Sequence, residues 1–401
     1  MLRQLDRPAR SGLGVITAYR DGTVTLRSNR REDGYTFSDT ENGYQEIRPG
    51  DLVFHALDGF AGAVGISDSH GNGSPVYHVC EPMAGDYPAY LARLLRHLGT
   101  SGFLTTQAPN VRERSVDFRN WSTFARIPLV LPPADEQRFI ADYLDRETAR
   151  IDTLIEEQQR LIEMLHERRR SVMQHAVAGS DRSGVRQTGD AWWPELPDGW
   201  APVSLRRVLR GLADGPHFSP NYVDNGVMFL SARNIKVDGW SLDDAKFVSE
   251  ADYLEFSKRV VPEPGDVLYT KGGTTGIARV VDLDFPFQVW VHVAVLKVRR
   301  DLVEPSFLAY ALNSDPCYEQ SQLFTRGATN NDLGLTRIVN IVAPLPPLDE
   351  QRRIVAYLND EIAKIDALIA ETERFIELAW ERRSALITAA VTGQIDVREV
   401  A

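Results

Sequence analysis

The chain has 401 residues, of which 43% are hydrophobic and 25% charged, and its formal net charge is −11. This composition excludes a disordered or fibrous protein and provides enough apolar material for two or three globular domains. The N-terminal stretch lacks an apolar core of signal-peptide length, and no run of about 18 apolar residues occurs, so we expect neither secretion nor membrane insertion. Cys80 and Cys317 have no CxxC spacing and no cluster of histidines near them. We therefore expect no zinc site, no disulfide framework and a cytoplasmic location.

The charge is unevenly distributed along the chain. Residues 1–31 hold seven arginines against two aspartates, whereas residues 132–180 and 346–401 carry net charges of −3 and −4. A basic stretch on an acidic protein is compatible with DNA binding if the acidic segments face a protein partner. The alternative is an arginine-rich surface without a ligand.

Residues 1–131 and 202–345 both show the pattern of mixed, strand-rich domains. Short apolar runs such as 52–54, 76–79 and 227–230 alternate with Gly, Asp, Asn and Pro. Each domain has a Pro-Gly-Asp turn that leads into a predicted strand, at 49–51 and at 264–266. We therefore predict one scaffold used twice with different loops.

Each domain is followed by a segment that occurs twice. Residues 132–179 recur as residues 346–393 at an offset of 214, and 25 of the 48 aligned positions are identical. Each copy opens on Pro-Pro followed by acidic residues, which suits the first turn of a helix, and closes on Gly179 or Gly393 at the place of a C-terminal cap. We predict two alike helices, each about 66 Å long.

Apolar residues follow a heptad pattern in both copies, which predicts a coiled coil. One seam position is assigned to Leu144, Ile151, Leu165 and Val172 and the next to Leu154 and Leu161, with Ile155 and Ile162 widening the stripe. The second copy repeats the pattern with Leu358, Ile365, Ala379 and Leu386, with Leu368 and Phe375, and with Ile369 and Ile376. Antiparallel packing is favoured, because in a parallel pair the second domain, about 37 Å across, would have to bridge a whole rod.

Gln158 and Thr372 interrupt the seam at equivalent positions near the middle of each helix. In an antiparallel pair these two side chains would meet near the pseudo-twofold axis and could fix the register. The alternative is that one polar residue is tolerated at a wide point of the seam.

The predicted fold class is α+β, with two mixed strand-rich domains separated by a long antiparallel two-helix coiled coil in a pseudo-twofold tandem repeat. The predicted segments are a first domain, a helix, a linker, a second domain, a second helix and a tail, at residues 1–131, 132–180, 181–201, 202–345, 346–393 and 394–401. One departure from the repeat is expected. Met1 aligns with Gly215, so the first domain lacks a counterpart of roughly residues 186–214, including the first strand, and we expect it to be shortened and less stable.

Motifs for catalysis are scarce. The sequence has no GxxxxGK[ST] loop and no HExxH motif. The glycine-rich run 271–276 lies between two predicted strands and not before a helix, which favours a hairpin that touches a DNA backbone over a nucleotide site. Asp266 with Lys271 is a loose candidate for a metal-dependent nuclease, but the first domain has the same turn without the lysine.

Loops rich in Arg, Asn, His, Ser and Gly suit DNA, because arginine reads guanine and asparagine reads adenine through paired hydrogen bonds. Each such loop alone is more often an ordinary surface loop, but these candidates fall in corresponding places of two domains. The candidates of the first domain are Arg20, Arg27, Arg30, Arg31, His55 and Arg114. Those of the second domain are His217, Ser231, Arg233, Asn234, Lys271, Gly272, Gly273, Thr274, Arg326, Asn330 and Asn331.

This layout resembles the specificity subunit of type I restriction-modification enzymes. The helix starts LPPADEQ and PLPPLDEQ and the IDxLI segments at 151–155 and 365–369 are similar to the spacer regions of that family. Three segments of the second domain are also similar to family members: WPELPDGW (193–200), GDVLYTKGG (265–273) and RGATNNDLGLTRI (326–338).

The resemblance implies a subunit without catalytic activity, in which each domain reads one half of an interrupted target in double-stranded DNA and the helices set the gap. It implies methyltransferase subunits that use S-adenosylmethionine to methylate adenine, and an endonuclease subunit that uses ATP and Mg, with no cofactor bound by this chain. No NPPY or DPPY methyltransferase motif occurs, which agrees with this division. The alternatives are a coiled-coil scaffold whose domains do not bind DNA, and a nuclease or methyltransferase active by itself.

Overall fold

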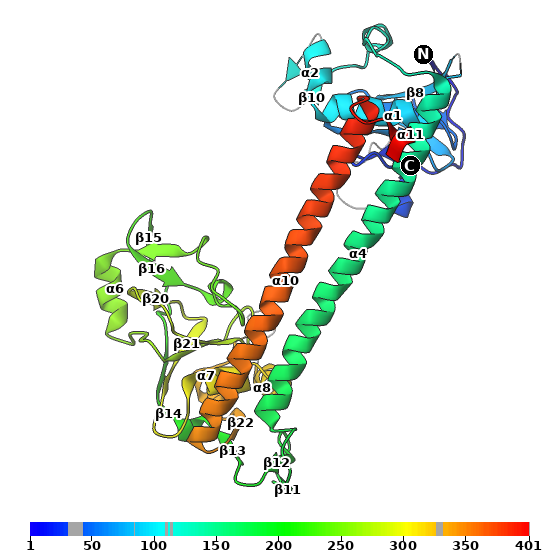
Figure 1. Ribbon diagram of the computed structural model, residues 1–401. Coiled ribbons are helices and arrows are strands. Elements are labelled where there is room, and N and C mark those ends of the chain that lie inside the picture. Colours follow the sequence, from blue (N-terminus) through cyan, green and yellow to red (C-terminus); the bar gives the residue numbers. More distant parts are fainter. Residues whose placement is uncertain (31–42, 84, 109–110, 113–114, 326–331, 401) are drawn as a thin grey trace. The chain divides into compact units, whose positions relative to one another are not determined.

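The computed structural model describes residues 1–30, 43–83, 85–108, 111–112, 115–325 and 332–400 (Figure 1). The chain divides into two compact units, Met1–Gln159 with Glu373–Ala401 and Arg160–Thr372. Each unit contains one strand-rich domain, parts of two long helices and a buried core of its own. Within the described ranges, no helix is both long enough and apolar enough to cross a lipid bilayer.

The two long helices are formed by the repeated segments. Helix α4 spans Ala134–Ala178 and α10 spans Leu348–Val391, drawn in green and in orange to red in Figure 1. Both start directly after the Pro-Pro pair and carry two acidic residues in the first turn, where carboxylates offset the partial positive charge of unpaired backbone amides. A glycine with positive φ follows each helix, +65° at Gly179 and +71° at Gly393. The predicted helix starts and glycine ends are confirmed.

The two helices pack antiparallel in the second unit. Arg169 of α4 pairs with Asp366 of α10 at 3.1 Å, and Arg182, just beyond α4, pairs with Glu350 at 3.0 Å. Partner numbers therefore fall along α10 as they rise along α4. Leu165, Ile365 and Ile369 form the small apolar core between these stretches.

The same direction holds in the first unit. Asp152 of α4 accepts two hydrogen bonds from the guanidinium of Arg383, at 2.8 and 3.1 Å. Nearer the start of α4, Ile140 and Leu144 share a core with Val391 at the end of α10. The predicted antiparallel pair of helices is confirmed.

The helix interface uses the first predicted seam position and the residues predicted to widen the stripe, but not the second predicted seam position. The buried positions include Ile151, Ile155, Leu165, Ile365 and Ile369, which are between 3% and 8% exposed. The second predicted seam position is exposed, at 38% for Leu154, 36% for Leu161, 50% for Leu368 and 44% for Phe375. That part of the heptad assignment is wrong. On a helix, the residues at i+3 and i+4 lie to either side of the residue at i. Because all three positions are apolar here, the sequence does not decide whether the i+3 or the i+4 residues face the partner helix.

Gln158 and Thr372 lie in different units. Gln158 is half-buried in the first unit, and Thr372 is 7% exposed in the second, where its hydroxyl donates to the carbonyl of Leu368 at 2.7 Å. Their meeting at the pseudo-twofold axis stays a prediction.

The second domain contains two four-stranded sheets. The first has the antiparallel order β14 (Leu209–Asp214), β21 (Val293–Val298), β18 (Val267–Thr270) and β19 (Ala278–Val280). The second has the order β15 (Tyr222–Val223), β17 (Lys246–Val248), β16 (Val227–Leu230) and β20 (Phe287–Val289), with β16 and β20 parallel. Two further ladders join β13 (Ala201–Ser204) to β22 (Val342–Leu345) and β11 (Val185–Gln187) to β12 (Glu195–Pro197). The helices are α5 (Leu205–Val208), α6 (Glu250–Ser257), α7 (Pro305–Leu312), α8 (Asp315–Phe324) and α9 (Leu335–Ile338).

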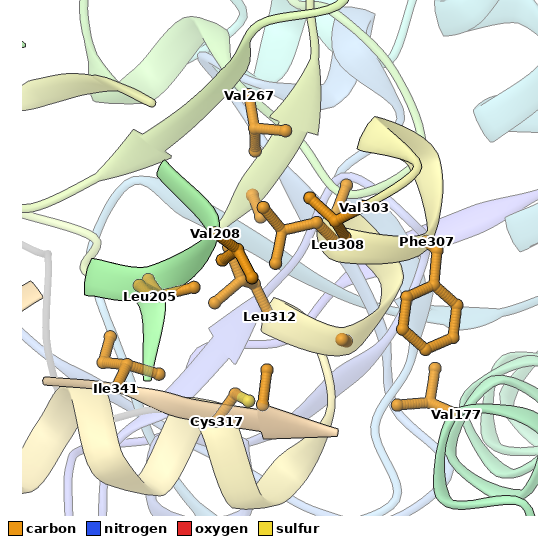
Figure 2. Close-up of a cluster of buried hydrophobic side chains, with 14 of the residues drawn as sticks. Val177, Leu205, Val208, Val267, Val303, Phe307, Leu308, Leu312, Cys317 and Ile341 are labelled. Atoms are coloured by element: carbon orange, nitrogen blue, oxygen red, sulfur yellow. The ribbon is translucent and has the colours of Figure 1, made fainter. Parts of the chain in front are cut away.

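The main core of the second domain joins the first of these sheets to α4 and α7. Figure 2 shows Leu205, Leu312 and Ile341 gathered on one side of this core and Phe307 of α7 facing Val177 of α4. All five side chains are 2% exposed or less. The C-terminal part of α4 is therefore a structural part of this domain.

The first domain contains a four-stranded sheet with the same topology as the first sheet of the second domain. Its order is β1 (Leu2–Gln4), β8 (Tyr77–Pro82), β5 (Leu52–His55) and β6 (Val64–Ile66), again antiparallel throughout. Shorter ladders join β2 (Ile16–Ala18) to β3 (Val24–Leu26), β4 (Gln45–Ile47) to β7 (Gly71–Gly73), and β9 (Val111–Arg112) to β10 (Ser115–Val116). The helices are α1 (Pro88–Thr100), α2 (Phe103–Gln107) and α3 (Trp121–Phe124), and α11 (Val397–Val400) ends the chain.

The shared scaffold is visible in the Pro-Gly-Asp turns. Gly50 and Gly265 have φ values of +91° and +84°, and the aspartates that follow, Asp51 and Asp266, are 8% and 2% exposed and precede the central strands β5 and β18. Only glycine adopts this conformation without strain. Strand β1 pairs with β8 as β14 pairs with β21, so β14 has a counterpart in the first domain, formed by residues that a fixed offset of 214 does not align with it. The shortening of the first domain relative to residues 186–208 stays a prediction.

The helix interface gives a matched test of the revised seam. Ile365→Ala should lower the free energy of unfolding by about 2–4 kcal/mol, because it leaves a cavity between the helices. Leu368→Ala, at the exposed position one turn away, should change it by less than about 0.5 kcal/mol. Urea unfolding of the full chain followed by circular dichroism compares the two, and equal losses would restore the original heptad assignment.

Candidate nucleic-acid interface

The second domain brings two of its candidate loops together at one edge of the first sheet. Strand β14 ends at Asp214, opposite Ala294 of β21, and β18 ends at Thr270, opposite Val293. Since both strands flank β21, the loop after Asp214 and the loop that starts at Lys271 are neighbours.

Lys271 lies buried between two carboxylates. Its side chain is 3% exposed, and its ammonium nitrogen is 2.7 Å from Oδ1 of Asp332 and 3.5 Å from Oδ2 of Asp214. A buried ammonium needs such partners, because an unpaired charge is strongly disfavoured away from water. The geometry thus favours a role for Lys271 in holding loops together over a direct contact with DNA.

Asp214 also holds two exposed nitrogen-bearing side chains. Nε2 of His217 lies 3.2 Å from Asp214 Oδ1, and Arg259 donates to the same oxygen and, through Nε, to the Asp214 carbonyl at 2.8 Å. The side chains of His217 and Arg259 are 61% and 47% exposed, whereas that of Asp214 is 2% exposed. One buried carboxylate therefore presents an imidazole and a guanidinium to solvent.

Residues 289–292 link these loops to a third candidate loop. The backbone N–H of Trp290 donates to the carbonyl of Leu230 at 2.8 Å, directly before residues 231–234, and the N–H of Lys271 donates to the carbonyl of His292 at 2.9 Å. The rings of Trp290 and His292 are partly exposed and lie 5.2 Å apart. The three loops therefore border one short segment.

Two glycines permit this close packing. A Cβ added to Gly215 would lie 1.9 Å from the carbonyl oxygen of Val289, and one added to Gly272 would lie 2.1 Å from Nδ1 of His292. Both distances are far below van der Waals contact. Beyond Gly272, Gly273 and Thr274 form an exposed tip that is open to a ligand.

Asn234 supports its own loop. It is 3% exposed, and its Oδ1 accepts hydrogen bonds from the N–H and hydroxyl of Ser231, at 2.8 Å each. Its Nδ2 donates to the carbonyl of Ser241 at 2.8 Å and to Asp244 at 3.1 Å, so little of its capacity remains for a base. Arg233, in the same turn, is exposed and has no hydrogen-bond or ion-pair partner among the residues that the structure describes.

In the first domain, the candidate arginines surround the β2–β3 hairpin. Arg20 is 65% exposed and pairs with Asp58 at 3.0 Å, and Arg27 Nε donates to Thr17 at 3.3 Å. Arg30 pairs with Asp21 and stacks over the ring of Tyr19, 4.7 Å from its centroid. Although burial opposes ionisation of Asp21, hydrogen bonds from Arg30 and Thr23 lower its pKa to about 2.

His55 is largely buried. Its Nδ1 accepts hydrogen bonds from the N–H groups of Leu57 and Asp58, at 3.2 and 3.1 Å, and its side chain is 17% exposed. Burial lowers the pKa of His55, against the raising influence of the Asp58 carboxylate. A neutral His55 thus shapes the turn that presents Asp58 to Arg20. The remaining candidates, Arg31, Arg114, Arg326, Asn330 and Asn331, lie outside the described residues.

Several residues of these surfaces were not identified from the sequence. Arg259, Trp290 and His292 join the loops of the second domain, and no spacing in the sequence relates them to Asp214. In the first domain, Glu46, with a 4% exposed side chain, has Arg10, Arg48 and His70 around it, at 3.1, 2.9 and 2.8 Å. These groups come from separate segments, so only the fold could reveal the cluster.

The structure does not bring together Asp266 and Lys271, the two residues considered for a metal-dependent nuclease. Asp266 and Lys271 lie at opposite ends of β18, and Asp266 pairs with Lys297 at 2.7 Å. No group of three or more His, Cys, Asp or Glu side chains that could hold a metal ion occurs among the described residues. At this edge the Arg259 guanidinium and the His217 imidazole are exposed, and the Trp290 indole is partly exposed.

Comparison with known proteins shows what the chain is similar to. Residues 223–377, which span most of the second domain and the first part of α10, match the family model described as the type I restriction modification DNA specificity domain. This match covers residues 223–377 of the chain, and over a longer range the chain is similar to specificity subunits of type I restriction enzymes. Its similarity extends to the MjaVIII specificity subunit of Methanocaldococcus jannaschii, 24% identical over 285 residues, which are 69% of this chain and 64% of the relative. The EcoBI specificity subunit of Escherichia coli is 22% identical over 303 residues, 73% of this chain and 64% of the relative.

Solved structures from type I systems have a fold similar to that of this chain. A chain from a study of complex assembly and conformational transition of the type I R-M system has a TM-score of 0.63 at 22% identity, covering 88% of this chain and 84% of that one. The HsdS subunit from Thermoanaerobacter tengcongensis has a TM-score of 0.50 at 23% identity, with 89% and 84% covered. The alignments with the two curated relatives span 64% of their length, slightly less than two thirds.

The Lys271 pairing gives a test of the site's architecture. Lys271→Met should destabilise β18 and the adjoining loops by about 3 kcal/mol, because Asp214 and Asp332 would lose their shared ammonium. Lys258→Met, at a 73% exposed lysine paired with the exposed Glu255, should cost less than about 0.5 kcal/mol. Hydrogen exchange of the β18 amides in the full chain measures both, and equal protection in the two variants would contradict a structural role for Lys271.

Proposed function

We propose that this chain is the DNA sequence-recognition subunit of a type I restriction-modification complex. The observation that carries the proposal is the match of residues 223–377 to a DNA specificity domain in a chain that carries two such scaffolds. In this proposal the chain reads a bipartite target and positions the methyltransferase and endonuclease subunits, without catalysing a reaction itself.

The shared sheet supports two reading domains with different targets. Both domains use the same four-strand order, so the loops at the strand ends occupy comparable places. The candidate side chains of the two domains differ, with Arg20, Arg30 and Tyr19 around the β2–β3 hairpin of one domain and Arg233, Arg259 and His217 in loops of the other. Different groups on one scaffold would read two different half-targets.

The ion pairs in these loops are compatible with DNA binding. Pairs such as Arg20–Asp58 are exposed, and exposed pairs contribute only about 0–1 kcal/mol. A phosphate could therefore replace the carboxylate at little cost. Release of the counterions condensed on DNA would then favour binding and make it dependent on salt.

The exposed apolar side chains of the helices support protein partners. In the first unit, Leu154, Phe375, Leu378 and Trp380 are between 38% and 51% exposed, and in the second unit Leu161, Met164 and Leu368 are between 36% and 58% exposed. Exposed apolar groups on a helix are typical of positions that a partner covers. We assign these positions to contacts with the methyltransferase subunits, with the endonuclease subunit joining the assembly. S-adenosylmethionine, ATP and Mg would be bound by those partners in the cytoplasm and not by this chain.

Mapping methylated adenines in the genome of the source organism tests the whole proposal. A split motif, with two short specified halves and an unread gap, should be methylated in the wild type and unmethylated after deletion of this chain. Reintroduction of the chain should restore it. A methylation pattern that does not change on deletion would contradict the proposal.

Arg233 tests the second domain as a reader. In the complex with its methyltransferase subunits, Arg233→Ala should weaken binding of the target by about 1–3 kcal/mol and relax one base of one half-site. Arg207→Ala, at an exposed residue beyond the other end of β14, is the matched control and should leave binding unchanged. Titrations at several salt concentrations provide the measurement, and a wild-type affinity that does not fall with salt would favour the non-DNA-binding scaffold.

A further inference from the structure

A cavity with a positively charged lining lies among three helices of the first unit. It has a volume of about 350 Å³ and is lined by residues of α1, of α4 and of the C-terminal part of α10. Sites for small ligands in proteins usually measure about 300–1,000 Å³. The lining includes the guanidinium groups of Arg93, Arg96 and Arg383. Charges of one sign in a partly enclosed space are typical of a site for an ion of the opposite sign.

Two of these arginines are paired with neighbouring carboxylates. Arg93 forms an ion pair with Asp145 of α4, and Arg383 donates to both carboxylate oxygens of Asp152, at 2.8 and 3.1 Å. The side chains of Arg93 and Arg383 are only 23% and 25% exposed. Both guanidinium groups are therefore fixed in place, and carboxylates offset their charges.

Arg96 is half-buried and has no such partner. It forms no ion pair with any residue that the structure describes, and its Nη2 makes a long hydrogen bond of 3.5 Å to the carbonyl of Arg20. Burial lowers the pKa of Arg96, as does the charge of Arg383, whereas the Asp21 carboxylate raises it. Because a guanidinium stays protonated in proteins, Arg96 brings a positive charge without a paired carboxylate into the cavity.

The side chain of Arg96 packs closely against two glycines. A Cβ added to Gly22 would lie 3.1 Å from Cδ and Nη1 of Arg96, and one added to Gly62 would lie 3.4 Å from its Nε. Both glycines have a positive φ, +90° and +96°, and their lack of a side chain leaves room for the arginine. A side chain held in this way loses little further freedom when it binds a ligand.

Neutral hydrogen-bonding groups lie beside Arg96. Ser384 and Thr388 of α10 line the same cavity, and the Thr388 hydroxyl is 3.4 Å from Nδ1 of His97 in α1. Burial lowers the pKa of His97, so its imidazole is neutral near pH 7 and has one N–H to donate. Guanidinium, hydroxyl and imidazole groups together are the donors that the several oxygens of a phosphate group accept from.

The second unit has a neutral side chain at the place of Arg96. Counted from the start of each helix, Arg96 of α1 corresponds to Asn313 of α7. The Asn313 carboxamide accepts from the N–H of Ala278 at 2.9 Å and donates to its carbonyl at 2.8 Å. Ala278 belongs to β19, so this arrangement does not involve the segment that precedes β14. The shared scaffold therefore does not require a positive charge here.

We propose that this cavity of the first unit binds a phosphate group. Arg96 balances the charge of the phosphate, and Ser384, Thr388 and His97 donate to its remaining oxygens. The group can belong to a small phosphorylated molecule or to the backbone of DNA, and these two sources can be separated by competition. The proposal does not rest on the reading of a DNA sequence.

Calorimetric titration of the full chain with inorganic phosphate, at constant ionic strength, tests the proposal. Binding should saturate at one phosphate per chain. Arg96→Asn, which introduces the residue of the second unit, should weaken it about tenfold or more, because charge-assisted hydrogen bonds are lost. Arg96→Lys keeps the charge and should weaken it less. Arg150→Ala, at an exposed arginine of α4, is the matched control and should leave binding unchanged.

A short DNA duplex of unrelated sequence separates the two sources. Competition by the duplex for the site that Arg96→Asn weakens would assign the phosphate to the DNA backbone. Lack of competition would assign it to a small phosphorylated molecule. The titration with inorganic phosphate contains no DNA, so its result is independent of whether the chain recognises DNA.

Three outcomes would overturn the proposal. The first is the absence of saturable phosphate binding to the wild-type chain. The second is equal binding by the wild type and by an Arg96→Asn variant whose circular dichroism spectrum is unchanged. The third is binding of acetate as tight as that of phosphate, because the site would then be one for carboxylates.

Discussion

The burial of one apolar stripe of α4 against one of α10 is the interaction on which both units depend. Outside that stripe the helices are mostly polar, so neither would be stable as an isolated helix of this length. Their ends are part of the domain cores, with Met173 and Ile354 in the second core and Ile140 and Ala390 in the first. Each domain is therefore completed by residues from both helices, and a domain cut free of them would expose part of its core.

The loops of the second domain are held by buried charge. Asp214 and Lys271 stand at the ends of two strands, and each neutralises the other while holding a further group, Arg259 or Asp332. The first domain has a similar buried ion pair, in which the carboxylate of Asp51 accepts hydrogen bonds from two guanidinium nitrogens of Arg7, at 2.6 and 2.9 Å. Buried ion pairs of this kind add little to the net stability of the fold, and their main effect is to hold the loops in one geometry. A rigid geometry is what a surface that discriminates between sequences needs.

The two units show how a repeat can diverge without losing its fold. The sheet order, the Pro-Gly-Asp turns and the helix ends are kept, and β1 occupies the position of β14 although it is only three residues long. In the second unit, β13 pairs with β22 and Trp200 is buried beside it. A short strand such as β1 is held in place by the hydrogen bonds of its neighbour β8.

The sequence by itself determined the features that depend on local order. Two similar helix starts, the capping glycines, the repeated Pro-Gly-Asp turn and the antiparallel direction all follow from neighbouring residues and from chain length. Only the tertiary structure decided that Leu154 and Leu368 are exposed while Ile155 and Ile369 are buried, because three adjacent apolar positions fit two different packing faces. Only the structure showed that the polar groups of Lys271 and Asn234 bind other residues of the same domain and that Arg233 is exposed. It also showed that His292 and Arg259 lie beside the candidate loops. Residue type indicates what a side chain could bind, whereas its availability depends on partners brought near from distant parts of the chain.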